Sequence, residues 1–212
     1  MIPPLKPTDR ADQALAWMEE FRTRHLPVVE DSRFLGLLGE EQILEGNDRQ
    51  RPVKEFELLC SHCFVHDWQY FYEVLKLAVD NQVDLVGVVD EHEEFLGVIT
   101  VQDTITAFAQ TTPVQATGSV IVLAMDSRDY SLTEISRLVE ENNARILSSS
   151  IKQDADDPHR IKVVLKINRE EVSAILATLE RFGYKVISRF QETEVTDSDR
   201  ERIDELLKYL DI

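Results

Sequence analysis

Apolar residues in the first half of the chain alternate between helical spacing and short continuous runs. Residues 9–23 carry apolar side chains three or four positions apart, which predicts an amphipathic helix: Ala14, Leu15, Met18 and Phe21. Apolar runs at residues 26–29 and 34–38 predict two strands joined by a turn. A short helix is expected at residues 40–44.

The same order of elements recurs further along the chain. A helix is predicted at residues 67–81, strands at 85–89 and 95–99, and a closing helix at 101–108. The register agrees between the copies, because the tripeptide Phe-Leu-Gly recurs at residues 34–36 and 95–97. Each copy is too small to bury both faces of its strands. We therefore expect the copies to pack together with pseudo-twofold symmetry and with ligand-binding clefts between them.

A linker at residues 111–113 separates this repeat from a different arrangement of elements. Strands are predicted at residues 120–125, 145–152, 161–167 and 184–190, and helices at residues 131–143 and 170–182. Ser131 and Glu134 have the spacing of a capping box, and Gly183 suits a helix C-cap. The order β-α-β-β-α-β is that of a ferredoxin-like unit. A final helix at residues 197–210 presents apolar residues that need a surface on this chain or on a partner: Ile203, Leu206, Leu207 and Leu210.

The predicted fold class is therefore α+β. We expect repeats at residues 1–50 and 51–112, a ferredoxin-like unit at residues 117–192, and a C-terminal helix at residues 196–212.

The charge of the chain narrows the classes of partner. It carries 40 acidic and 23 basic residues, a formal charge of −17. This excess argues against binding to nucleic acid or to an anionic membrane, because Lys and Arg hold phosphate groups. No apolar run reaches the roughly 18–20 residues that span a bilayer, and we see no signal peptide. We therefore expect a cytoplasmic protein.

Two cysteines, Cys60 and Cys63, stand in a Cys-x-x-Cys pattern with His62 and His66 nearby. Without a secretion signal we expect free thiols rather than a disulfide framework. Four candidate metal ligands within seven residues suit a tetrahedral site poorly. The next predicted helix begins too late for its dipole to activate a thiol. We therefore interpret the cysteines as small apolar residues and His66 as a residue at the edge of a cleft, and we expect no metal and no catalytic centre.

The repeat resembles a CBS domain pair, also called a Bateman module, over roughly residues 1–110. The matching segments are HLPVV at residues 25–29, FLGLL at residues 34–38, and their counterparts in the second copy. The resemblance implies a non-enzymatic regulatory protein. Such a protein binds an adenosyl compound (AMP, ADP, ATP or S-adenosylmethionine) in a cleft between the copies.

The segment GVITVQD at residues 97–103 looks like the nucleotide-binding motif of this family. Gly97 lets a ligand approach the strand closely, and Thr100 begins a helix whose free amides face outward. Asp103 shares the helix face of Thr100, and its carboxylate can accept hydrogen bonds from both hydroxyls of a ribose. The same two residues also suit a simple helix cap, so both interpretations stay open.

The resemblance places a tripeptide of the second copy along the adenine: Val83, Asp84 and Leu85. Asp84 would repel phosphate, and the candidate cations are Arg22, Arg24 and His25 of the first copy. Residues 1–113 also hold 21 acidic and only 9 basic side chains. An AMP-like ligand is therefore favoured over ATP.

In the first copy the motif is altered, because Gly39 and Gln42 stand where the second copy has threonine and aspartate. Gly39 has no hydroxyl, and Gln42 binds a ribose less well than a carboxylate does. Glu40 and Glu41 add negative charge where phosphates would lie. We therefore expect the cleft of the first copy to be empty.

The second unit resembles an ACT or ACT-like domain in topology and length. This resemblance implies side-by-side pairing of sheets in a homodimer and, in many members, amino-acid binding. The first strand-to-helix loop has no glycine and carries the bulky Arg128 and Tyr130, so we favour dimerisation without a ligand. A CBS pair joined to an ACT-like domain is similar to bacterial CBS–ACT proteins of the acetoin-utilisation type.

These observations predict a regulatory sensor of an adenine nucleotide with an unidentified protein partner. The expected ligand-binding residues are Gly97, Thr100, Asp103, Val83, Asp84, Leu85 and His66. A ligand-free interaction module with degenerate clefts is the first alternative, favoured by the altered first copy. An amino-acid sensor acting through the ACT-like domain is the second.

Overall fold

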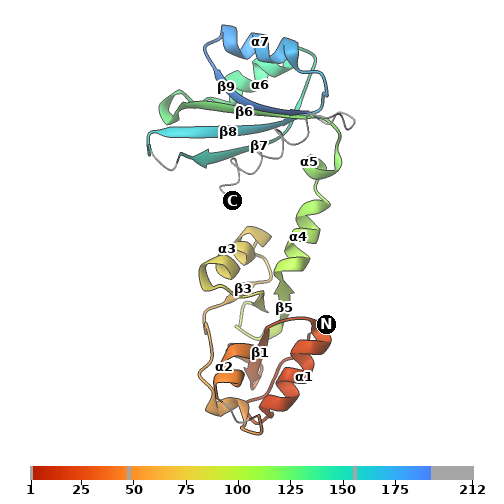
Figure 1. Ribbon diagram of the computed structural model, residues 1–212, viewed down its shortest axis with the longest axis vertical. Coiled ribbons are helices and arrows are strands. Elements are labelled where there is room, and N and C mark those ends of the chain that lie inside the picture. The colour runs from red at the N-terminus through yellow and green to blue at the C-terminus, as the bar shows by residue number, and fades with distance from the viewer. Residues whose placement is uncertain (1, 47–48, 155–156, 192–212) are drawn as a thin grey trace. The chain divides into compact units, whose positions relative to one another are not determined.

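The computed structural model describes residues 2–46, 49–154 and 157–191. The chain divides into two compact units, Met1–Ala109 and Gln110–Ile212, and each combines helices with β-sheet (Figure 1). The predicted α+β character is therefore confirmed. No helix in the described part of the chain is both long enough and apolar enough to cross a lipid bilayer.

The first unit contains both repeats. The first repeat consists of α1 (Ala11–Phe21), β1 (His25–Glu30), β2 (Arg33–Gly39) and α2 (Glu40–Glu45). The second repeat consists of β3 (Phe64–His66), α3 (Phe71–Asn81), β4 (Leu85–Val89), β5 (Phe95–Thr100) and α4 (Val101–Ala109). A short helical turn, η1 (Val53–Glu55), lies in the connection between the repeats.

The repeats agree down to single backbone conformations. Arg22 and Gln82 both end a helix in the left-handed region, with φ of 53° and 55°. The hairpins β1–β2 and β4–β5 are both antiparallel, and each has an irregularity at the equivalent pair of valines. These correspondences confirm the tandem repeat predicted from the apolar pattern.

Each repeat also contains a parallel backbone pairing that the apolar pattern did not predict. Leu5 pairs with Val28 of β1, just as the middle of β3 pairs with β4. The amide of Val29 donates to Leu5 O at 2.9 Å, and the Leu5 side chain is fully buried. Segments of one to three residues are too short to show a period, which is why the sequence did not reveal them.

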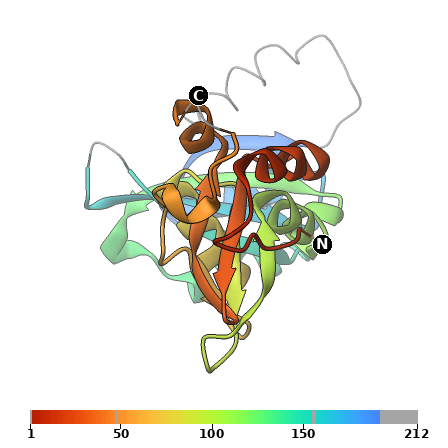
Figure 2. The same ribbon diagram turned by 90° about the horizontal axis from the view of Figure 1, so that it is seen from below.

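The two repeats pack on each other within the first unit. Phe34 of β2 stacks on Phe95 of β5, with ring centroids 6.2 Å apart, and meets Phe64 of β3 edge-on at 6.1 Å. The amide of Phe95 donates to Ser32 O at 2.7 Å. Figure 2 shows the first repeat, coloured red to orange, beside the yellow to green second repeat. The predicted packing of the copies is therefore confirmed.

The second unit has the predicted element order β-α-β-β-α-β. Its elements are β6 (Ser119–Asp126), η2 (Ser127–Asp129), α6 (Leu132–Glu140), β7 (Ile146–Gln153), β8 (Arg160–Ile167), α7 (Ser173–Arg181) and β9 (Lys185–Gln191). The strands form one antiparallel sheet in the order β7-β8-β6-β9, and α6 and α7 cover one face of it (Figure 1). The core lies between that face and the helices: its fully buried side chains include Ile121, Leu123, Ile135, Leu138, Leu165 and Ile167.

The helix ends of this unit follow the predicted caps in part. Ser131 Oγ accepts a hydrogen bond from the amide of Glu134 at 3.3 Å, and Gly183 adopts φ of 86° after α7. In a capping box the Glu134 carboxylate would accept from the amide of Ser131. Here it accepts instead from the hydroxyl of Tyr184 at 3.1 Å. Burial, together with this hydrogen bond, raises the pKa of Tyr184 to about 12.

The expected linker at residues 111–113 is not extended throughout, because the short helix α5 (Thr112–Gln115) begins within it. Proline is tolerated in the first turn of a helix, where its missing amide has no partner to lose. The predicted C-terminal helix at residues 197–210 lies outside the described residues.

Candidate functional site

Thr100 and Asp103 hold each other at the start of α4. The hydroxyl and amide of Thr100 donate to Asp103 Oδ2 at 2.7 and 3.0 Å, and the amide of Asp103 donates to Thr100 Oγ1 at 2.9 Å. This reciprocal arrangement has the form of a capping box, with aspartate at its third position. A hydroxyl and a carboxylate are thereby fixed in one place at the helix N-terminus.

Part of this arrangement is still available to a ligand. Asp103 is exposed, and its Oδ1 receives no hydrogen bond from any residue that the structure describes. A Cβ atom built on Gly97 of β5 would meet nothing within 4 Å. The chain's own packing therefore does not require glycine at residue 97, and the space beside the strand is open.

The predicted adenine segment lies directly next to this motif. Leu85 pairs with Thr100 across the β4–β5 hairpin, and the amide of Val101 donates to Asp84 O at 2.9 Å. The side chains of Val83 and Leu85 are buried in the core of the first unit. What this segment can offer a ligand is therefore its backbone and the carboxylate of Asp84.

His66 lies away from the other predicted residues. It pairs with Val89, at the opposite end of β4 from Leu85 and Thr100. Its ring stacks on Trp68 at 4.2 Å, and its Nδ1 lies 3.0 Å from Asp90 O. The structure thus brings together Asp84, Leu85, Thr100 and Asp103, but not His66.

Asp84 forms a polar contact between the two repeats. Its carboxylate lies 2.6 Å from His25 Nδ1 and accepts from the amide of Arg24 at 2.8 Å. Burial by itself would raise the pKa of Asp84, but these hydrogen bonds outweigh it and hold the pKa below its ordinary value. His25 therefore contacts Asp84, the carboxylate that was expected to repel phosphate. The sequence alone did not show this contact.

A cavity of about 320 Å³ lies at the altered motif of the first repeat. It is lined by residues of both repeats and of their connection: Arg24, His25, Gly39, Glu40, Glu41, Gln42, Leu59, Asn81 and Gln82. Gln42 Oε1 is buried with no hydrogen-bond partner among the described residues, and a Cβ on Gly39 would come within 2.2 Å of it. Gly39 therefore makes room for the Gln42 side chain. The contribution of α3 to this cavity had no signal in the sequence, because Asn81 and Gln82 are close to it only in space.

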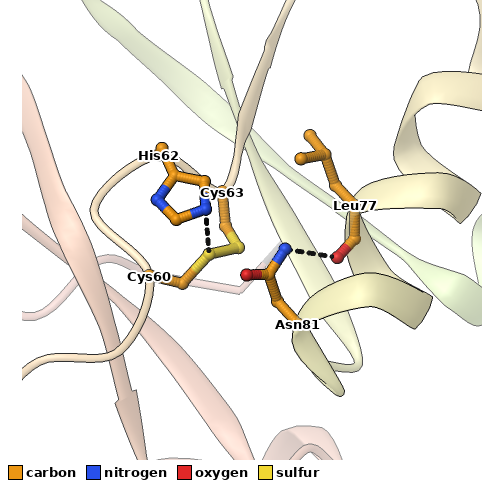
Figure 3. Close-up of a disulfide and its surroundings, with 5 residues drawn as sticks. All are labelled: Cys60, His62, Cys63, Leu77 and Asn81. Atoms are coloured by element: carbon orange, nitrogen blue, oxygen red, sulfur yellow. Dashed lines mark hydrogen bonds between the residues drawn. A yellow bond between two sulfur atoms is a disulfide. The ribbon is translucent and has the colours of Figure 1, made fainter.

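Cys60 and Cys63 form a disulfide (Figure 3). The expectation of two free thiols is therefore wrong. A tight turn joins the two residues, with the amide of Cys63 donating to Cys60 O at 3.1 Å, and it brings their Cα atoms to 5.3 Å, within the range for a disulfide. Over the described residues, no three His, Cys, Asp or Glu side chains are grouped so as to hold a metal ion.

The first loop of the second unit contains an ion pair between Asp126 and Arg128. Asp126 accepts hydrogen bonds from the amide and Nε of Arg128 at 3.1 and 3.2 Å. These bonds hold the pKa of Asp126 below its ordinary value. The carboxylate of Asp126 is thus engaged within its own loop.

No protein-family model matches the chain. Among solved structures, a CBS domain pair/ACT domain protein from Thermotoga maritima is similar at 22% identity, over 52% of this chain and 91% of that one, with a TM-score of 0.47. The structure of CBSX2 in complex with AMP is similar at 20% identity, over 51% of this chain and 88% of that one, with a TM-score of 0.44. The CBS domains of a transcriptional regulator from Streptococcus pneumoniae show 17% identity, over 50% and 87% of the two chains, with a TM-score of 0.42. Two of these similar structures are thus described as CBS-domain proteins, and the third contains AMP.

Proposed function

We propose that the first unit is a regulatory, non-enzymatic module that binds an adenosyl compound at the start of α4. The observation that carries this proposal is the fixed pair of Thr100 and Asp103, with Asp103 Oδ1 uncommitted and open space beside Gly97. A carboxylate held in this way accepts hydrogen bonds from the two hydroxyls of a ribose, and water at this exposed position exchanges easily for a ligand.

The neighbouring groups favour a ligand with few phosphates. The backbone of residues 83–85 lies beside Thr100 and offers amide and carbonyl groups to a base edge. The carboxylate of Asp84, 2.6 Å from His25 Nδ1, carries a negative charge that would repel a phosphate chain. AMP or an uncharged adenosyl group therefore suits the motif better than ATP.

For the second unit we propose an ACT-like, ferredoxin-like domain that pairs with a second copy. Its element order and its four-stranded antiparallel sheet support this proposal, and β7 and β9 provide edge strands. Because Asp126 is paired with Arg128 and this loop has no glycine, we assign no amino-acid ligand to this domain.

Isothermal titration of the whole protein with AMP, ADP, ATP and S-adenosylmethionine tests the nucleotide proposal. We expect millimolar or tighter binding of AMP, and at least a roughly tenfold loss of affinity in Thr100→Ala/Asp103→Ala, since hydrogen bonds to a charged group are worth about 1.5–3 kcal/mol. The Thr100→Ser variant keeps the hydroxyl and should bind as the natural protein does.

Two controls separate lost binding from lost folding. Thr106 lies on the same helix, where its hydroxyl donates to Gln102 O at 2.8 Å, so Thr106→Ala should leave affinity unchanged. Circular dichroism should show the same secondary structure in all variants. Equal AMP affinity in the double variant and the natural protein, or no binding of any of the four compounds, would contradict the proposal.

A further inference from the structure

The disulfide lies in the connection between the two repeats, and the backbone on each side of it is bonded to a different repeat. On one side, Leu59 and Leu37 of β2 exchange two hydrogen bonds of 2.7 and 2.8 Å. On the other, the amide of Gly87 in β4 donates to Cys63 O at 2.9 Å. The turn at residues 60–63 therefore joins the two hairpins at close range.

The two sulfur atoms differ in their access to solvent. Cys63 is fully buried, whereas Cys60 is half-buried and next to the exposed His62. The Nε2 atom of His62 lies 3.8 Å from Cys60 Sγ (Figure 3). An attacking thiolate from solvent therefore meets Cys60 first, and an imidazole stands beside that sulfur.

The disulfide also holds a backbone conformation that would otherwise be unfavourable. Cys60 has φ of 50°, in the left-handed region, which costs a residue with a Cβ atom free energy relative to ordinary conformations. Breaking the bond frees Cys60 to leave this region. Cys60 directly follows Leu59, which exchanges two backbone hydrogen bonds with Leu37 and whose O lies 2.8 Å from where a Cβ on Gly36 would stand.

The same turn borders the cavity of the first unit. Leu59 lines this cavity from the connection and Asn81 lines it from α3. Asn81 lies beside the disulfide, with its side-chain amide donating to Leu77 O at 2.9 Å (Figure 3). The turn and the cavity wall are therefore neighbours, since Leu59 precedes Cys60 in the chain and also lines the cavity.

We propose that Cys60–Cys63 is a thiol–disulfide exchange site for a dithiol reductant, and that its redox state sets how tightly the connection packs against the first repeat. The proposal is independent of nucleotide binding. One thiol of the reductant attacks Cys60 Sγ as thiolate, the S–S bond breaks, and Cys63 leaves with the electron pair and takes up a proton. The second thiol then attacks the mixed disulfide and releases Cys60, which is also protonated. The protein gains two electrons and two protons, and the dithiol becomes a disulfide.

His62 acts as a positioning residue in this exchange. Its Nε2 atom, 3.8 Å from Cys60 Sγ, can donate a hydrogen bond that stabilises the Cys60 thiolate leaving in the second step, because a nearby donor favours the thiolate form. The His62→Ala variant should therefore be reduced by dithiothreitol more slowly than the natural protein, while Leu37 and Leu59 keep the same protection in the oxidised state.

Hydrogen exchange measured by mass spectrometry on the full chain tests the proposal. In protein oxidised with glutathione disulfide, we expect the peptides containing Leu37 and Leu59 to be protected and both cysteines to resist iodoacetamide. After treatment with dithiothreitol, two labels should appear, and these peptides should exchange roughly tenfold faster. Peptides of β8 in the second unit serve as the internal control and should not change.

The Cys60→Ser/Cys63→Ser variant provides the matched comparison, since it should exchange rapidly with and without dithiothreitol. Two outcomes would overturn the proposal. One is complete labelling of both cysteines in protein treated with glutathione disulfide. The other is equal protection of Leu37 and Leu59 in the oxidised and the reduced natural protein.

Discussion

At the scale of single residues, the contact between the repeats depends on a difference between equivalent positions. Arg24 and Asp84 occupy the same place in the two copies, because Glu40 N bonds to Arg24 O at 2.8 Å just as Val101 N bonds to Asp84 O. A perfect repeat would bring identical side chains together here. Instead, the carboxylate of Asp84 meets His25 and the amide of Arg24.

We expect Asp84→Asn to destabilise the first unit by about 1.5–3 kcal/mol at neutral pH, the range for losing a hydrogen bond to a charged group. Because folding lowers the pKa of Asp84, its stabilisation is complete above the ordinary carboxyl pKa of about 3.9 and is lost as the pH falls through the folded-state value. Thermal melts between neutral pH and acid should show this loss in the natural protein and a flatter curve in Asp84→Asn. Parallel curves for the two proteins would contradict the assignment.

At the scale of elements, the sequence predicted most helices and strands because their apolar residues recur over four or more positions. The strand at Phe64–His66 was not predicted, because three residues are too few to show a period. The start of α3 was placed too early, because Asp67 and Gln69 bond back to Val89 and His66 in a turn before the helix. The Thr100–Asp103 pair was visible as a motif, whereas the reach of His25 to Asp84 depends on how the copies pack, which no local pattern encodes.

Gly118 and Gly97 differ in whether the fold itself requires a glycine, and alanine substitutions test this difference. Gly118 has φ of 144°, and a Cβ there would lie 2.0 Å from the backbone oxygen of Ile167, while Gly97 has open space. We expect Gly118→Ala to destabilise the second unit by about 2–4 kcal/mol. Gly97→Ala should leave stability unchanged or raise it by up to about 1 kcal/mol, yet weaken AMP binding. Denaturant titration and calorimetry measure the two effects, and equal losses of stability in both variants would refute this distinction.

At the scale of the whole molecule, the negative charge is unevenly divided. Residues 1–113 carry 21 of the 40 acidic side chains but only 9 of the 23 basic ones. Such an excess repels added phosphates over a distance of about one Debye length, roughly 10 Å at 0.1 M salt. The first unit should therefore discriminate between adenine nucleotides by charge as well as by shape.

We expect the affinity for ATP to be lower than that for AMP at low ionic strength, and the difference to narrow as salt is added, because screening removes repulsion. Titrations of the whole protein with both nucleotides over a series of salt concentrations measure this change. An ATP affinity that falls with salt more steeply than the AMP affinity would show that cations, not carboxylates, surround the phosphates.

The buried Leu5 has a practical consequence for cutting and tagging the chain. Leu5 lies before α1 and pairs with β1 in the first repeat, as β3 pairs with β4 in the second repeat. A protease cut or a truncation between Leu5 and Ala11 would therefore leave both helices of the repeat intact but remove a backbone partner from Val29 and empty a buried position in the core. Fragments of the first unit that are designed from its helices alone should consequently be poorly folded, while those that begin before Leu5 should retain the whole repeat.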